Sequence, residues 1–236
     1  MSEAVNEVAG RTIVITGAAS GIGHALAQGF LADGAAVVAC DVRSEGLAPL
    51  ASRGAITRQV DVRAREQVHD LIEAARNETG RVDVLVNNAG YGSRKPVEQL
   101  EAGEFERMIE VHLFGGVHGM RFAIPIMREQ GHGRIINLLS RAAEASGPKD
   151  AAYSAAKAGL WAATRSAARE CADTDILVNG LIPGPTNTAI WGRDMPQLQA
   201  PEAVYPTARM LASLPAGGPS GQVFWDEKPY PLMQKP

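Results

Sequence analysis

The chain of 236 residues has little cysteine, no long apolar run and no excess of either charge, and each shortage excludes a class of protein. Its two cysteines, Cys40 and Cys171, lie far apart and form neither a C-x-x-C pair nor a disulfide framework. No apolar run approaches the roughly 20 residues that span a bilayer. Lys and Arg number 23 and Asp and Glu number 26, so at a net charge of −3 we expect no general attraction to nucleic acid or anionic membranes.

Two further signals are absent. The histidines show no H-x-x-x-H or H-E-x-x-H spacing and there is no cysteine cluster, so we predict no metal site. The first ten residues carry Glu3 and Glu7 but no basic segment, which disfavours a secretory signal and makes a cytoplasmic location the expectation.

Short β-rich runs alternate with longer helical patterns along the chain. The predicted strands are nearly continuous apolar runs, as strands covered on both faces require, and they are Thr12–Thr16, Ala36–Cys40, Ile56–Val60, Val82–Val86, Arg134–Leu139, Ile176–Leu181 and Gln222–Trp225. The predicted helices are Ile22–Asp33, Arg65–Glu78, Glu104–Glu129, Tyr153–Cys171 and Glu202–Ser213. This alternation predicts a doubly wound α/β fold, with a mostly parallel seven-stranded sheet between helices, in one domain over residues 1–236.

Proline marks a change near the end of the chain. Of 14 prolines, ten lie at or after Pro183. Proline has no N–H to donate and a fixed φ, so this part cannot be continuous helix or central strand. We therefore expect an irregular region over Pro183–Ala200, and such loops carry function more often than cores do.

A glycine-rich turn follows the first predicted strand and opens the first predicted helix. Its sequence is TGAASGIG, from Thr16 to Gly23. Glycines let the backbone turn sharply and approach a ligand closely, and the N–H groups of a helix start suit a pyrophosphate. Alone this turn is a weak signal, because ordinary tight turns share its composition.

The second predicted strand strengthens the case for a dinucleotide. It leads into Asp41, which lies 24 residues after Gly17. A carboxylate about 20 residues beyond the first glycine binds the ribose hydroxyls of NAD, and it would repel the 2′-phosphate of NADP. Ser20 is not basic and also favours NAD, whereas Arg43 and His24 favour NADP because either can reach a phosphate. We predict NAD, with NADP as the alternative.

Five motifs in order now resemble one family. They are the TGxxxGIG turn, Asn87-Asn88-Ala89-Gly90, Ser140, Tyr153-x-x-x-Lys157 and Pro183-Gly184. From about residue 8 to about residue 190 the chain resembles a short-chain dehydrogenase/reductase. The resemblance implies a Rossmann-like fold, a homodimer or homotetramer, and an NAD-dependent oxidoreductase that interconverts a secondary alcohol and a ketone.

The same resemblance implies which residues hold the cofactor. They are Gly17, Ser20, Gly21, Ile22, Gly23, Asp41, Asp61, Val62, Asn88, Ala89, Gly90, Tyr153, Lys157, Pro183, Gly184, Thr186 and Thr188. In such an enzyme Asp61 and Val62 lie beside the adenine, and Lys157 holds the hydroxyls of the nicotinamide ribose.

Acid–base chemistry is expected from Tyr153. Lys157 lies four residues later on the same predicted helix, so the two side chains share a face. A free tyrosine has a pKa of about 10 and is a poor base at neutral pH, and we expect the ammonium group to lower that pKa. Ser140 ends a predicted strand, where parallel sheets bind ligands, and its hydroxyl can hold the substrate oxygen.

One position departs from the family. Members commonly have asparagine within V-N-L-x-G, whereas this chain has His112. That asparagine supports a water that links the lysine to solvent for proton exchange. A histidine can donate and accept a hydrogen bond, so two interpretations stay open. In one, His112 holds a relay water and titrates near neutrality; in the other, it packs without a proton role.

Three segments are expected around the substrate, namely Tyr91–Lys95, Arg141–Lys149 and Pro185–Trp191. Only about a dozen residues separate Thr188 from Pro201, which predicts a fairly open site. Two other functions remain open at this point: an NADP-linked carbonyl reductase, and a dinucleotide-binding regulatory protein with weak turnover.

Overall fold

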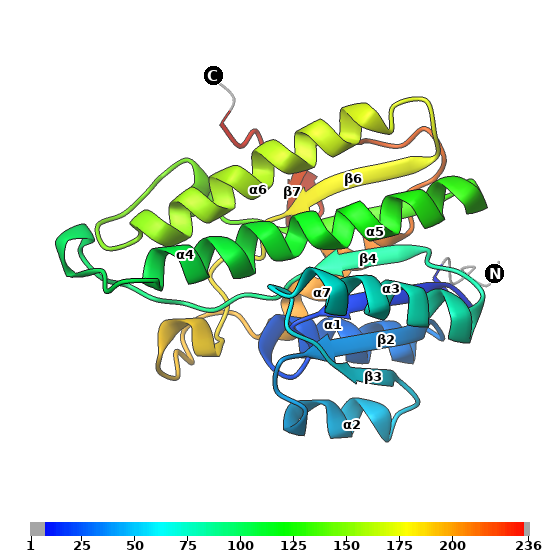
Figure 1. Ribbon diagram of the computed structural model, residues 1–236, viewed down its shortest axis with the longest axis horizontal. Coiled ribbons are helices and arrows are strands. Elements are labelled where there is room, and N and C mark those ends of the chain that lie inside the picture. Colours follow the sequence, from blue (N-terminus) through cyan, green and yellow to red (C-terminus); the bar gives the residue numbers. More distant parts are fainter. Residues whose placement is uncertain (1–7, 234–236) are drawn as a thin grey trace.

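An eight-stranded sheet forms the centre of the computed structural model, which describes residues 8–233 (Figure 1). Its order is β3-β2-β1-β4-β5-β6-β7-β8, and all strand pairs are parallel except β7 with β8. The strands are β1 (Thr12–Thr16), β2 (Ala36–Asp41), β3 (Ile56–Gln59), β4 (Val84–Asn87), β5 (Gly133–Leu138), β6 (Ile176–Leu181), β7 (Val223–Trp225) and β8 (Lys228–Pro229). The predicted doubly wound fold is confirmed, with one strand more than the seven expected.

The additional strand β8 closes a short hairpin at the sheet edge. Phe224 pairs with Pro229 and Trp225 pairs with Lys228. The two residues between the strands, Asp226 and Glu227, have φ of 52° and 58°. A two-residue hairpin turn of this kind normally carries Asn-Gly or Asp-Gly, so the Asp-Glu pair gave no turn signal in the sequence.

Helices cover both faces of the sheet, and an apolar layer is buried between the helices and the sheet on each face. The helices are α1 (Gly21–Ala32), α2 (Ala48–Ala51), α3 (Arg65–Thr79), α4 (Glu104–Ile109), α5 (Gly115–Gln130), α6 (Ala151–Glu170) and α7 (Tyr205–Ala212). Buried residues of α3, α5 and the later part of α6 form one core cluster with the sheet, and those of α1, α2 and α7 form a second. A small third cluster joins Met108 of α4 to Ala152 and Ala156 of α6. Between residues 8 and 233, no helix combines the length and apolarity needed to cross a membrane.

The predicted long helix from Glu104 to Glu129 is interrupted by a π-helical turn. This turn covers Glu110–Phe114 and joins α4 to α5. Single π turns inside helices are frequent at functional sites, and here the turn carries the buried side chain of His112. Beyond it, α5 and α6 lie side by side (Figure 1), because a Cβ on Gly116 would lie only 2.7 Å from Leu160.

The irregular region after β6 folds back on itself. Asn187 N–H donates to the Gln199 carbonyl over 2.8 Å, and Thr186 and Gln199 form an isolated bridge. Trp191 Nε1 donates to the Thr186 carbonyl over 2.8 Å. The segment 186–199, here called the return loop, thus satisfies much of its own backbone, and its single helical turn covers Ala189–Trp191.

Core packing on the α3 face predicts a large effect for one substitution. Ile72 is 0% exposed and lies in the core cluster of that face. Ile72→Ala should lower the free energy of unfolding by about 2–5 kcal/mol, because it removes buried methyl groups and leaves a cavity. Asn77→Ala, on the exposed side of α3, is the control and should change it by less than about 0.5 kcal/mol. Equal changes in the free energy of unfolding of Ile72→Ala and Asn77→Ala, measured by urea denaturation, would contradict this packing.

Candidate active site

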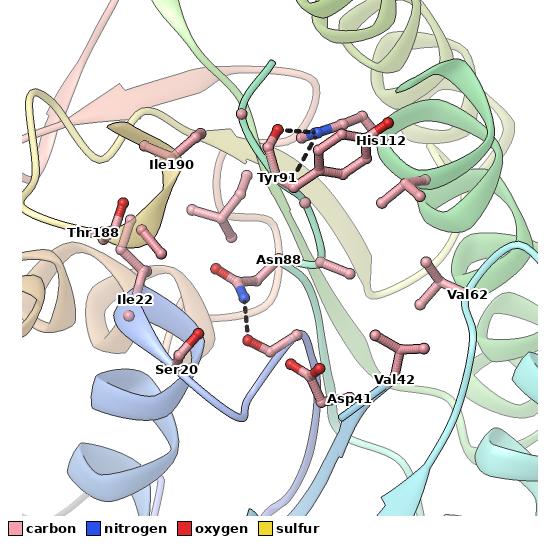
Figure 2. A pocket seen from close by; sticks show the side chains of 18 of the residues that line it. Ser20, Ile22, Asp41, Val42, Val62, Asn88, Tyr91, His112, Thr188 and Ile190 are labelled. Carbon is pink, nitrogen blue, oxygen red and sulfur yellow. Dashed lines mark hydrogen bonds between the residues drawn. The ribbon is translucent and has the colours of Figure 1, made fainter. Parts of the chain in front are cut away.

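A cavity of about 540 Å³ opens at the carboxyl ends of the parallel strands (Figure 2). In the sheet β1 lies between β2 and β4. The strand order therefore runs toward opposite edges of the sheet on the two sides of the cavity. Open α/β sheets bind their ligands at such a switch point. The β1–α1 turn, the end of β2, the π-helical turn and α6 contribute to its wall.

The glycine turn forms one side of the cavity. Gly17 and Gly21 have φ of +70° and +57°, a region that favours glycine. A Cβ on Gly17 would also lie 2.7 Å from the Cα of Ala89. Ser20 makes no capping bond to α1, and its hydroxyl instead accepts from Arg43 Nη2 over 2.9 Å. The first N–H groups of α1 therefore have no side-chain cap and suit an anion.

Two carboxylates lie on the neighbouring wall, and both are held in place. Asp41 is 8% exposed, and its oxygens accept from the backbone N–H groups of Ala19 over 3.0 Å and Arg43 over 2.9 Å. Asp61 pairs with the guanidinium of Arg63, with Nη2 to Oδ2 at 2.6 Å, and this pairing lowers the pKa of the Asp61 carboxyl. Fixed carboxylates of this kind can accept hydrogen bonds from sugar hydroxyls.

Side-chain bonds lock the turn after β4 onto the turn after β1. Asn88 Nδ2 donates to the carbonyls of Thr16 over 2.8 Å and Gly17 over 3.0 Å, and one of these bonds is drawn in Figure 2. The Thr16 hydroxyl in turn accepts from the backbone N–H groups of Asn88 and Ala89, each over 3.1 Å. The floor of the cavity is therefore rigid where two diverging segments meet.

Tyr153 and Lys157 lie on the far wall of the cavity, and Ser140 contacts Tyr153 from outside the lining. Tyr153 and Lys157 lie one turn apart on α6, with Lys157 Nζ 5.7 Å from the centre of the tyrosine ring. Lys157 is 5% exposed, and its Nζ donates to the carbonyl of Leu138 at the end of β5 over 2.6 Å. Ser140 hydrogen-bonds the side chain of Tyr153, and its Oγ accepts from the N–H of Ala142 over 3.1 Å.

Burial shifts the pKa of both Tyr153 and Lys157. It raises the pKa of Tyr153 above its ordinary value, an effect that the hydrogen bond from Ser140 opposes. The lowered tyrosine pKa expected from the sequence is thus corrected, since burial has the largest effect on the pKa of Tyr153 and raises it. Burial also lowers the pKa of Lys157 to about 7, so its charge responds to any group placed beside it.

His112 packs between two tyrosines rather than at the surface. Its ring centre lies 5.2 Å from that of Tyr153, edge to face, and its Nε2 lies 2.9 Å from the carbonyl and 3.1 Å from the N–H nitrogen of Tyr91. Figure 2 shows His112 and Tyr91 at the cavity wall. Burial and the charge of Lys157 lower the pKa of His112 to about 3. Both effects move the pKa of His112 away from the titration near neutrality that the sequence left open.

Comparison with known proteins identifies the family. The sequence pattern of the family described as short chain dehydrogenase matches residues 11–199. The chain belongs to the short-chain dehydrogenase family. It is therefore an oxidoreductase, and members of this family bind a nicotinamide dinucleotide. The uncapped helix start, the glycine turn and the fixed carboxylates fit such a cofactor.

Curated relatives and solved structures agree with this short-chain dehydrogenase assignment. A 2-dehydro-3-deoxy-L-rhamnonate dehydrogenase (NAD(+)) from Sphingomonas is 34% identical over 84% of this chain and 81% of its own. A 3beta-hydroxysteroid dehydrogenase 2 from Eggerthella lenta is 36% identical over 80% and 77%. The crystal structure of 3-ketoacyl-(acyl-carrier-protein) reductase from Brucella melitensis complexed with NADH is 31% identical, covers 92% of this chain and 96% of its own, and has a TM-score of 0.86.

Most residues that the sequence assigned to the short-chain dehydrogenase site line the cavity. They are Gly17, Ser20, Gly21, Ile22, Asp41, Asp61, Val62, Asn88, Ala89, Gly90, His112, Tyr153, Lys157, Pro183 and Thr188.

Four assigned residues lie off the cavity wall. A Cβ on Gly23 would lie 2.2 Å from a carbonyl oxygen of the glycine turn, so this glycine permits close packing. Ser140 reaches the site through its bond to Tyr153. Gly184 takes a φ of +72°, and Thr186 is 4% exposed and directs its hydroxyl to the backbone.

The wall also contains residues that the sequence analysis did not assign. They include Arg63, Arg107 and Val111. Arg107 and Val111 lie four residues apart, and that helical spacing was a usable signal for a shared face. Arg63 follows Asp61 by two residues and pairs with it. No group of three or more metal-ligating side chains is found within residues 8–233.

The buried histidine predicts an acid-dependent stability. The pKa of His112 is about 3 in the folded protein and about 6.5 in an unfolded chain. Between these values the unfolded state binds a proton that the folded state does not, so stability falls as pH falls, by up to about 1.4 kcal/mol per pH unit. His112→Asn should lack this component. The test is urea denaturation from pH 7 to pH 4, with His69→Asn, an exposed position, expected to parallel the wild type. A parallel curve for His112→Asn would refute the buried neutral imidazole.

Proposed function

We propose that this short-chain dehydrogenase uses NAD to interconvert a secondary alcohol and a ketone, with Ser140, Tyr153 and Lys157 as catalytic residues. The observation that carries the proposal is the position of Tyr153 on the cavity wall, one helical turn from the buried Lys157, whose Nζ lies 5.7 Å from the centre of the tyrosine ring and donates to the Leu138 carbonyl. A phenol so placed can take a proton from a substrate hydroxyl or return it to a carbonyl.

Each of the three side chains has a distinct role in this proposal. The Ser140 oxygen already accepts from Ala142 N–H, so its own hydrogen is free to orient toward Tyr153 or the substrate oxygen. Lys157 commits one N–H to the Leu138 carbonyl and keeps two for ribose hydroxyls. Bound NAD supplies the hydride acceptor. Holding the reactants in this geometry can contribute about 7–11 kcal/mol to lowering the barrier.

We propose that His112 acts as an uncharged member of a proton relay. A second cavity of about 10 Å³, close to the space that one water needs, is lined by Asn87, His112 and Lys157. Within the described part of the chain, Asn87 Oδ1 and His112 Nδ1 are buried with no hydrogen-bond partner. These two atoms support a water beside Lys157, which would pass protons without a change in the charge of the imidazole.

The preference for NAD rests on Asp41. Its carboxylate is fixed at the end of β2 by two backbone N–H groups, and a 2′-phosphate would meet this negative charge. A Sphingomonas relative is named for NAD(+) and the Brucella structure holds NADH, which supports the same choice. The NADP-linked reductase remains the second candidate, because Arg43 bonds Ser20 at the glycine turn.

We also propose that the protein forms a homodimer or homotetramer through α5 and α6. Some of the small residues on these helices serve contacts within the chain, since Gly116 faces Leu160 and Gly159 faces Leu113. Others, such as Ala155 and Ala162, are exposed and leave a face on which a second copy can pack closely.

The acid–base role predicts the effect of Tyr153→Phe. Removing the hydroxyl should lower kcat by about 10²–10⁴-fold, since no other group can exchange the proton, while the free energy of unfolding changes little. A panel of secondary alcohols and ketones, followed by absorbance of the reduced nicotinamide, measures this. Tyr205→Phe, on the far face of the sheet, is the matched control. Equal turnover in Tyr153→Phe would refute the site, and absence of wild-type turnover on every compound would favour the regulatory protein.

The proposed cofactor preference predicts the effect of Asp41→Ala. Losing a charged hydrogen-bond acceptor should weaken NAD binding by about 10- to 100-fold, equivalent to roughly 1.5–3 kcal/mol, and should improve NADP binding because the repulsion is gone. Asp41→Asn keeps the shape and should act in the same direction. Fluorescence titration of both cofactors measures the ratio, and an unchanged ratio in both variants would contradict the assignment.

A further inference from the structure

Arg94 forms a two-pronged ion pair with the residue that precedes α6. Its Nε lies 3.0 Å from Asp150 Oδ1 and its Nη2 lies 3.2 Å from Asp150 Oδ2. The side chain of Asp150 is only 10% exposed, although that of Arg94 is 58% exposed. A buried carboxylate needs such a partner, and paired planar groups fix geometry more tightly than a point charge does.

Because the Asp150 carboxylate pairs with Arg94, it does not cap the start of α6. Aspartate before a helix normally accepts from an N–H of the first turn, yet Asp150 makes no side-chain cap to α6. Its carboxylate instead faces a segment that follows β4, more than 50 residues earlier in the chain. Since Tyr153 lies three residues after Asp150, this contact fixes the turn that carries the proposed acid–base group.

Arg94 also contacts the return loop. Its guanidinium lies over the ring of Trp191, 5.3 Å from the ring centre. A Cβ on Gly92 would lie 2.0 Å from the Ile190 carbonyl oxygen, so the segment around Arg94 packs directly on that loop. Arg94 thus joins three segments at the edge of the cavity: the chain after β4, the start of α6 and the return loop.

We propose that Arg94 is a positioning residue: it clamps the Asp150 carboxylate on one side and the Trp191 ring on the other, and so fixes Tyr153 against the loop that borders the substrate. This rests on the proposed function, in which Tyr153 exchanges the proton. The clamp predicts that Arg94 affects the chemical step more than it affects cofactor binding.

The clamp also sets the charges around the phenol. Tyr153 is faced by His112 and Tyr91 from the neighbouring segments, by Lys157 from its own helix, and by the Asp150–Arg94 pair. The Asp150 charge raises the pKa of Tyr153 and the Arg94 charge lowers it. Loss of Arg94 alone would leave an unpaired carboxylate near the phenol and disfavour its ionised form.

A mutant cycle in the intact enzyme tests the proposal. Arg94→Gln should move the rise of kcat with pH in alcohol oxidation to higher pH by about one unit, and should lower kcat several-fold with NAD affinity within about twofold of the wild type. Asp150→Asn should move the rise to lower pH. Arg94→Gln combined with Asp150→Asn should return it toward the wild-type value, because no carboxylate is left unpaired.

The controls separate this proposal from the proposed function. Arg81→Gln removes an equivalent arginine from a buried carboxylate, Asp83, at the opposite end of β4, and should leave the pH profile unchanged. Amide hydrogen exchange over residues 147–154 needs no turnover, and Arg94→Gln should accelerate it whether or not the wild type is active. Unchanged exchange, a wild-type pH profile in Arg94→Gln, or a double variant as shifted as Arg94→Gln would each overturn the clamp.

Discussion

The buried ammonium group of Lys157 is the constraint on which the site depends. A charge removed from water loses several kcal/mol of hydration, and this one donates to the Leu138 carbonyl at the end of β5. Its pKa accordingly falls to about 7. The apolar packing of Leu160 with sheet residues such as Ile135 and Val178 holds α6 over the sheet regardless. The protein therefore carries a cation close to its titration point, which any added hydroxyl or anion in the cavity would stabilise.

The neighbouring elements explain how that lysine comes to face a cavity. Parallel strands end at one edge, and the bonds between Asn88 and the Thr16–Gly17 turn keep the two central ends from separating. The π-helical turn then moves the His112 ring against Gly90, where a Cβ would lie 2.4 Å from the imidazole. The glycine at position 90 is thus required by the histidine at position 112, although the two lie on different elements.

Much of this arrangement could be predicted from the sequence, because its signals are local. The seven strand runs, the glycine turn and the Tyr153–Lys157 spacing each follow from residue types at short range. The remainder depends on contacts between distant segments. The β8 hairpin has no glycine to mark it, and the π-helical turn leaves the apolar periodicity of a helix intact. The direction of the shift in the Tyr153 pKa depends on how deeply the phenol is buried, which spacing along a helix does not give.

The end of β2 shows how rigidity, rather than charge alone, supports a choice between cofactors. Asp41 and Arg43 carry opposite charges within two residues. Asp41 is 8% exposed and held by two backbone N–H groups. The Arg43 side chain is 61% exposed, bonds the Ser20 hydroxyl, and lies 3.8 Å from Asp41 Oδ1 through its Nε. An arriving phosphate can displace or recruit the arginine at small cost, but it cannot move the carboxylate without breaking backbone bonds of the glycine turn. In the proposed preference for NAD, the fixed negative charge therefore outweighs the mobile positive one, because the preorganised group acts on every ligand that enters.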